Sequence, residues 1–145
     1  MTTSAILAAN HRLRPADRIV APKSLLNIVQ HHALFAGHCA QGHAWVIENM
    51  VNVGVTYTRF DHFMQRIGTV KQIVRFGGDR WAQQAVVERA QQRLGRRYDL
   101  ATYNCEHFVN DALHDQRHSR QAETAKEVLK GALVVGVLAL IVRAA

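Results

Sequence analysis

The sequence predicts a single α+β domain built on a small antiparallel β-sheet, and two observations support this prediction. Short apolar segments with the alternation of strands occupy the first half of the chain, and amphipathic segments of helical period follow in the second half. A length of 145 residues is enough for one domain with a substantial core and too short for two ordinary domains.

The first half of the chain is predicted to be an N-terminal segment followed by β-strands. Residues 1–14 are expected to be weakly structured, and Pro22 should end the first short strand. The predicted strands cover residues 17–21, 31–37, 44–48 and 53–58, with a polar turn at 38–43 that makes a hairpin of the middle two. Side chains alternate along a strand, so His31 should share one face with Ala33, and His32 should face the other way.

The second half changes to helical patterns. The predicted elements are a short helix over 59–67, a basic strand over 70–76, a helix from Asp79 that Gly95 stops, and a helix over 105–113. The helix after Asp79 is predicted to bury one stripe, made of Trp81, Ala85, Val86, Ala90 and Leu94. The main folded domain should therefore span residues 15–114, followed by a linker over 115–124.

Residues 125–145 predict a hydrophobic C-terminal helix. Residues 131–142 are an unbroken apolar run of twelve, flanked by Lys130 and Arg143. A bilayer-spanning helix needs about 20 such residues, but Lys and Arg side chains can reach the interface from within a helix. The tail therefore predicts either a membrane anchor or an interfacial or self-packed helix. No cleavable signal is visible, so a cytoplasmic protein, membrane-associated through this helix, is expected.

Charge and composition narrow the partners. The formal net charge is +7 at pH 7, which favours an anionic partner such as an anionic membrane surface. The basic residues are spread along the chain without a DNA- or RNA-binding motif, so nucleic acid is not expected as a partner. The histidines lack the paired spacing of a zinc site, and the sequence suggests no metal and no organic cofactor. Oligomeric state is left open.

The most informative segment is Asn104-Cys105-Glu106-His107-Phe108. Asn104 is a good helix N-cap, which would place Cys105 in a first helical turn. Backbone N–H groups and the helix dipole there lower the pKa of a thiol and favour the nucleophilic thiolate. His107 would project away from the thiol and is interpreted as a packing residue or as one that supports the site from behind. The other cysteine, Cys39, lies in the polar turn and reads as a bystander.

A nucleophilic thiol needs a base and a polar group that orients the base. His31 is the preferred base, and His32 replaces it if the strand register slips by one residue. Glu48 on the returning strand is the preferred third member, because a carboxylate would hold the imidazole tautomer. Asn49, which points to the other face, is the alternative.

Two motifs give the chain a family resemblance. The string Tyr103 to Val109, with Tyr98-Asp99-Leu100 ahead of it, resembles the signature of the lecithin retinol acyltransferase family, whose NCEHF motif carries a nucleophilic cysteine. That family also has an upstream strand of the form His-x-small-apolar-aromatic-x-Gly. Residues 31–37 match this form and thereby select His31 over His32. The likeness covers about residues 15–114.

The resemblance implies a fold and a chemistry. The family is similar to NlpC-type cysteine peptidases, with a papain-like core circularly permuted so that histidine precedes cysteine. It implies an antiparallel sheet that carries His31 and Glu48 and packs against the helix headed by Cys105. Eukaryotic members usually have a second histidine where this chain has Glu48, which weakens the implication of lipid acyl transfer.

The expected function is therefore that of a thiol-dependent acyltransferase or acyl hydrolase. A Cys105 acyl-enzyme would form with His31 as base, and the basic surface and apolar tail point to phospholipid acyl esters, or another acyl donor, as substrate. The alternatives are an NlpC-like amidase or peptidase acting on amide bonds, and a catalytically silent module that binds lipid or protein.

Overall fold

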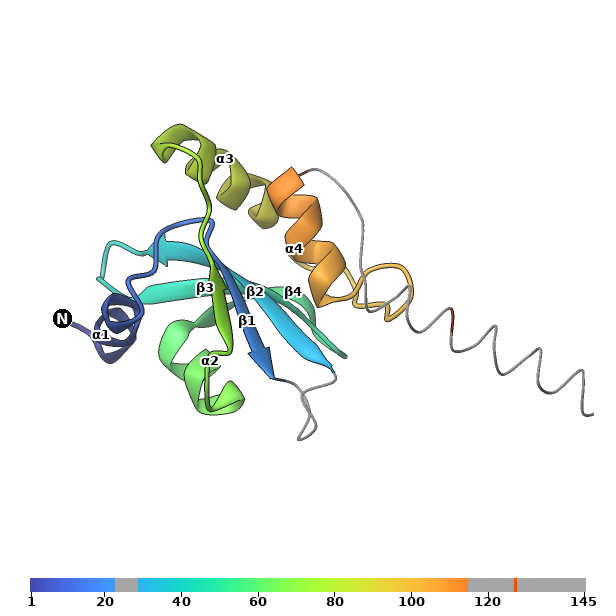
Figure 1. Ribbon diagram of the computed structural model, residues 1–145, viewed down its shortest axis with the longest axis horizontal. Helices are drawn as coiled ribbons and strands as arrows, with labels where there is room; N and C mark the ends of the chain where they lie inside the picture. The colour runs from blue at the N-terminus through green and yellow to red at the C-terminus, as the bar shows by residue number, and fades with distance from the viewer. Residues whose placement is uncertain (23–28, 115–126, 128–145) are drawn as a thin grey trace, which may run out of the picture.

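A five-stranded antiparallel sheet lies between two pairs of helices in the computed structural model (Figure 1). The structure describes residues 1–22, 29–114 and 127. The strands are β1 (Arg18–Pro22), β2 (Gln30–His38), β3 (Ala44–Met50), β4 (Gly54–Arg59) and β5 (Gln72–Val74), in the spatial order β4-β3-β2-β1-β5. The helices are α1 (Thr3–Asn10), α2 (Phe60–Ile67), α3 (Arg80–Gln91) and α4 (Cys105–His114). The predicted α+β class with an antiparallel sheet is confirmed.

Each face of the sheet has its own core. On one face, Leu34 of β2 and Ile47 of β3 pack with Phe108 of α4 and with residues of α3. On the other face, Ala33 and Phe35 pack with residues of α1 and α2. Because both faces are covered, the run His31–Phe35 of β2 is buried without a break. The alternation predicted from the sequence therefore separates two buried faces of the sheet rather than a core face from a solvent face.

The strand register brings the hairpin residues into the expected order. Ala33 of β2 pairs with Glu48 of β3, so the Glu48 side chain lies on the same face as Ala33, and alternation puts His31 there as well. The register shifts between Phe35 and Gly37, and Gly37 has a φ of 109°, a conformation that a residue without Cβ adopts readily. This irregularity lies beyond the part of β2 that carries His31 and His32.

Residues 1–14 are not a weakly structured lead, as the sequence suggested, because they contain helix α1. The Thr2 side chain caps this helix by accepting from the Ala5 N–H at 3.3 Å. The Ser4 hydroxyl accepts from the Ala44 N–H at 3.0 Å, and Ala8 is buried in the α2-side core. An isolated helix of this length is marginal in water, so it is tertiary packing that stabilises α1, and packing leaves little periodic signal in eight residues.

The buried stripe predicted for α3 is wrong in part. The helix buries Val86, Val87 and Ala90, whereas Trp81 is 79% exposed and Leu94 lies beyond the helix and is 42% exposed. The helix ends at Gln91, before the glycine expected to stop it. Periodicity gives the direction of an apolar stripe but not the length over which a partner covers it, and the α3 residues that join the core, Val86 and Ala90, lie in its second half.

Two further expectations concern the ends of the predicted elements. The basic strand over 70–76 is shorter than expected, since β5 covers only Gln72–Val74 and pairs with β1 at the sheet edge. The linker over 115–124 and the helix over 125–145 lie outside the described residues, apart from Glu127. Within the described ranges, no helix is both long and apolar enough to cross a bilayer.

Candidate active site

Cys105 begins α4, and its neighbours in the chain fix that helix end. The Asn104 side-chain oxygen accepts from the N–H groups of Glu106 and His107, both at 3.0 Å. In the other direction, His107 Nδ1 accepts from the Asn104 N–H at 3.1 Å. This is a reciprocal capping box in which histidine takes the position usually held by Glu or Gln. Asn104 thus caps the helix as predicted, and His107 fixes the backbone beside Cys105.

His31 and Glu48 form a close pair on the α2 side of the sheet. His31 Nε2 lies 2.6 Å from Glu48 Oε2, and the carboxylate is fully buried. The His31 ring also lies 6.2 Å, centroid to centroid, from the ring of Phe63 in α2. The strand pairing explains the contact, because Glu48 faces Ala33, the residue two positions after His31 on the same face.

The thiol reaches this pair around the end of β2. Helix α4 packs against β2 and β3 on the opposite face from α2, but Cys105 is its first residue and lies beside the start of β2. The Cys105 Sγ is 3.7 Å from the Gln30 carbonyl oxygen, and Cys105 also hydrogen-bonds the His31 side chain. Because His31 Nε2 faces Glu48, Nδ1 is the ring nitrogen left for the thiol.

Electrostatics favour the charged form of the His31 ring. Burial alone would lower the pKa of His31, but its hydrogen bonds with Cys105 and Glu48 outweigh burial and raise the pKa from 6.5 to about 9. Burial would also raise the pKa of Glu48, yet the hydrogen bonds from His31 and Arg66 lower it below its usual value. At neutral pH, His31 is therefore an imidazolium held against the Glu48 carboxylate.

Arg66 of α2 completes this cluster and was not identified from the sequence. Its Nη2 lies 2.7 Å from Glu48 Oε1 and 2.5 Å from Oε2. The guanidinium also lies 5.6 Å from the centroid of the Phe63 ring, and Nη1 is 2.9 Å from the Met50 sulfur. No motif or spacing ties Arg66 to His31 in the sequence, because the contact depends on how α2 docks on β3.

The alternative residues lie elsewhere. His32 points to the α4 side, where its Nδ1 accepts from Arg18 Nε at 3.0 Å. Burial and the Arg18 charge lower the pKa of His32 to about 3, so it stays neutral and occupied as an acceptor. The Asn49 side chain donates to the Tyr103 carbonyl at 2.7 Å and so ties β3 to the loop before Cys105. Neither residue approaches the His31 ring in the way that Glu48 does.

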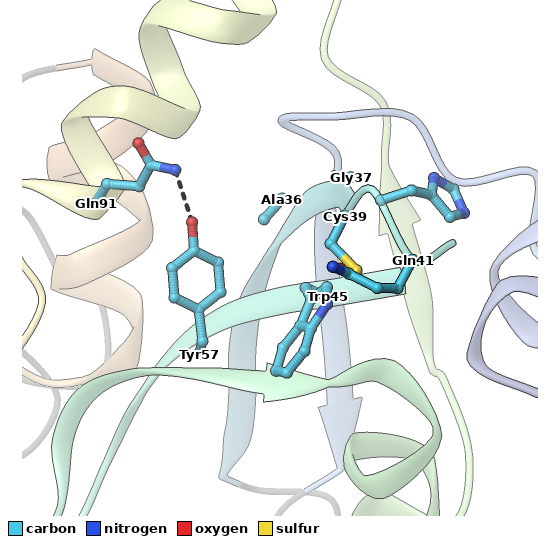
Figure 2. A pocket seen from close by; sticks show the side chains of 8 residues that line it. Ala36, Gly37, Cys39, Gln41, Trp45, Tyr57 and Gln91 are labelled. Atoms are coloured by element: carbon cyan, nitrogen blue, oxygen red, sulfur yellow. Dashed lines mark hydrogen bonds between the residues drawn. The ribbon is translucent and has the colours of Figure 1, made fainter. Parts of the chain in front are cut away.

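Cys39 lies at the other end of β2, in a separate pocket of about 420 Å³ (Figure 2). It lies eight residue steps from His31, which is about 26 Å for an extended chain. A hydrogen bond from the Trp45 side chain holds the pKa of the half-buried Cys39 thiol below its usual value. Tyr57 crosses the pocket to accept from the Gln91 side chain at 2.7 Å. The two cysteines therefore occupy unrelated sites.

The described ranges contain no group of three or more His, Cys, Asp or Glu side chains arranged to hold a metal ion. The groups available for chemistry at this end of the sheet are a thiol that contacts an imidazole and a carboxylate that contacts the same imidazole.

Comparison with known families gives the same picture. A family model described as "Permuted papain-like amidase enzyme, YaeF/YiiX, C92 family" matches residues 3–131. The chain belongs to this family. Membership in this family supports the assignment of the chain as a cysteine-type hydrolase with a permuted papain-like architecture. No curated protein and no solved structure matches the chain.

The family assignment refines the resemblance noted in the sequence. The permuted papain-like superfamily is confirmed, whereas membership in the lecithin retinol acyltransferase family is not. The matched region begins at residue 3 and so takes in α1, which the likeness at residues 15–114 had left out. Cysteine hydrolase chemistry is thus supported at the level of the family.

Proposed function

We propose that this protein is a thiol-dependent amidase that works through an acyl-enzyme on Cys105. In the proposed cycle the Cys105 thiolate attacks the amide carbonyl and forms the C–S bond of a thioester. The His31 imidazolium protonates the leaving amine as the C–N bond breaks. Water then attacks the thioester and gives one proton to His31, and the C–S bond breaks to release the acid, which restores the Cys105 thiolate and the His31 imidazolium.

The observation that carries this proposal is the position of His31 between two partners. One ring nitrogen faces the Glu48 carboxylate at 2.6 Å, and the Cys105 thiol hydrogen-bonds the same side chain. A carboxylate in that position would hold the ring orientation and stabilise the imidazolium. The start of α4 adds the positive end of a helix dipole where negative charge develops on the carbonyl oxygen.

A phospholipid acyl ester at an anionic membrane surface is the second candidate substrate, with the protein membrane-associated at least during turnover. It is favoured by apolar side chains exposed at the site end of the sheet: Val51 and Val53 in the turn after β3, and Leu100 in the loop before α4, are each at least half exposed. Such side chains suit an acyl chain or a lipid interface. The net charge of +7 fits an anionic surface.

The test is turnover of matched amides and esters by the full-length protein. N-acyl amino acids, short peptides and vesicles of phosphatidylcholine with phosphatidylglycerol would be compared, with product release followed by mass spectrometry. The wild type and Cys39→Ala should turn over the same substrates, whereas Cys105→Ala and His31→Gln should lose at least about a thousandfold in rate.

The outcomes separate the candidates. Amide turnover without ester turnover supports the amidase, and the reverse supports the lipid acyl hydrolase. Full activity in Cys105→Ala would refute a covalent thiol mechanism. A Cys105 thiol that resists iodoacetamide in the folded protein would instead favour the catalytically silent binding module.

A further inference from the structure

We infer that Arg66 is a positioning residue, which holds the Glu48 carboxylate in the orientation that receives the His31 N–H. The inference rests on the proposed thiol mechanism and adds a fourth residue to it. The contacts of Arg66 are with Glu48, Met50 and the Phe63 ring, so it would act on the imidazole and the thiol through Glu48.

The geometry at Glu48 shows what Arg66 contributes. The terminal torsion of a Glu side chain is soft, so the contacts from His31 and Thr58 would by themselves leave the plane of the carboxylate loosely set. Arg66 Nη2 contacts both oxygens and so fixes that plane with Oε2 directed at His31 Nε2. Glu48 is fully buried, so bulk water is poorly placed to provide this second contact.

Arg66 is itself held in place from two sides. Its guanidinium lies over the Phe63 ring at 5.6 Å and contacts the Met50 sulfur through Nη1 at 2.9 Å. Phe63, one helical turn earlier in α2, also borders the His31 ring. One short helix thus supplies both an aromatic wall for the imidazole and a cation for its carboxylate partner. The Arg66 side chain stays 43% exposed, so its substitution removes little packing.

The charge of Arg66 gives the inference a pH signature. A buried carboxylate prefers its neutral form, and Glu48 stays ionised because His31, Arg66 and Thr58 donate hydrogen bonds to it. Without Arg66, Glu48 should take up a proton at higher pH, and a neutral carboxyl group orients and stabilises the imidazolium poorly. The loss of thiol reactivity should therefore grow as the pH falls.

The experiment is the pH dependence of Cys105 alkylation by iodoacetamide in the Cys39→Ala background, followed by intact mass. Arg66→Met should lose about tenfold in alkylation rate at pH 5 and about two- to threefold at pH 8. The rise of the rate on the acid side of the pH profile should move to higher pH by about one unit. Arg66→Lys keeps the charge and should recover part of the loss. The matched control is Arg59→Met, because Arg59 is similarly exposed and pairs with Asp61 rather than Glu48.

A second comparison tests whether Arg66 acts through Glu48. Adding Arg66→Met to Glu48→Gln should change the profile no further, since residues in one chain of contacts are not additive. The inference is overturned if Arg66→Met follows Arg59→Met at every pH, or if its loss is the same at pH 5 and pH 8. If Arg66→Met fails to fold, the alkylation rate of Arg66→Lys between pH 5 and pH 8 is compared with that of Arg59→Met, and the same outcomes support or overturn the inference. A wild-type thiol that is inert at all pH values would refute the thiol mechanism itself.

Discussion

Replacing Glu48 by Gln removes one negative charge from the site while keeping the size of the side chain. The carboxylate is fully buried and its Oε2 lies 2.6 Å from His31 Nε2. An opposite charge this close shifts a pKa by about one to three units. The pKa of His31 is raised to about 9 by Cys105 and Glu48 together, against burial. We therefore expect Glu48→Gln to lower the pKa of His31 by about one to two units.

The same change has a signed effect on stability. A histidine whose pKa rises on folding, here from 6.5 to about 9, stabilises the fold fully below pH 6.5, and that stabilisation is lost as pH rises through 9. At 1.36 kcal/mol per unit it amounts to about 3 kcal/mol. Wild type and Glu48→Gln should therefore differ most in free energy of unfolding below pH 6.5, by about 1–3 kcal/mol, and less at pH 10.

The assay is an NMR titration of the His31 ring between pH 5 and pH 10.5, with the signal assigned through His31→Gln. The control is Asp17→Asn, which also removes a buried carboxylate, one held by Arg75 at 2.6 Å at another part of the sheet. This control should lose stability without moving the pKa of His31. An unchanged pKa of His31 in Glu48→Gln would refute the view that the carboxylate supports the imidazolium.

Three further changes test other parts of the structure. His32→Gln should leave the pH profile of Cys105 alkylation unchanged, because His32 has a pKa of about 3 and stays neutral; a displaced profile would contradict its exclusion as the base. Asn104→Ala should cost about 2 kcal/mol in urea unfolding, since two helix N–H groups lose their acceptor, whereas Asn104→Asp should keep most of the stability. Gly54→Ala should cost about 2–4 kcal/mol, because a Cβ there would lie 2.4 Å from the Arg96 carbonyl oxygen at a φ of 87°. Gly42→Ala, at a φ of 78° with open space around it, should cost about 1 kcal/mol, and equal costs would show that the close approach at Gly54 is unimportant.

Much of the site was accessible from the sequence because its signals are local. The capping of Cys105 by Asn104 depends on residues within one helical turn, and it is present as predicted. The alternation that separates His31 from His32 is a property of any extended strand, and the structure places the two rings on opposite faces. The strands β1 to β4 and helices α2 and α4 begin and end within about two residues of expectation.

Other features escaped because they depend on packing between distant segments. Helix α1 is stabilised by contacts with the β2–β3 hairpin and with α2. Trp81 is exposed because the core residues of α3 lie further along the helix. Arg66 reaches Glu48 because α2 packs against β3 at a position that places the end of the helix beside Glu48. Periodicity carries no record of such distances, since it describes one segment at a time.

The sequence by itself determined the kinds of groups and their local presentation: a capped thiol at the start of a helix, a histidine strand, and a carboxylate on its hairpin partner. Only the tertiary structure decided that these groups meet. The thiol belongs to a helix on one face of the sheet and the imidazole points to the other, and they join because both lie at the same end of β2. The physical reason is that buried apolar area on both faces sets where α4 and α2 dock, and the charged groups take the positions that this packing leaves them.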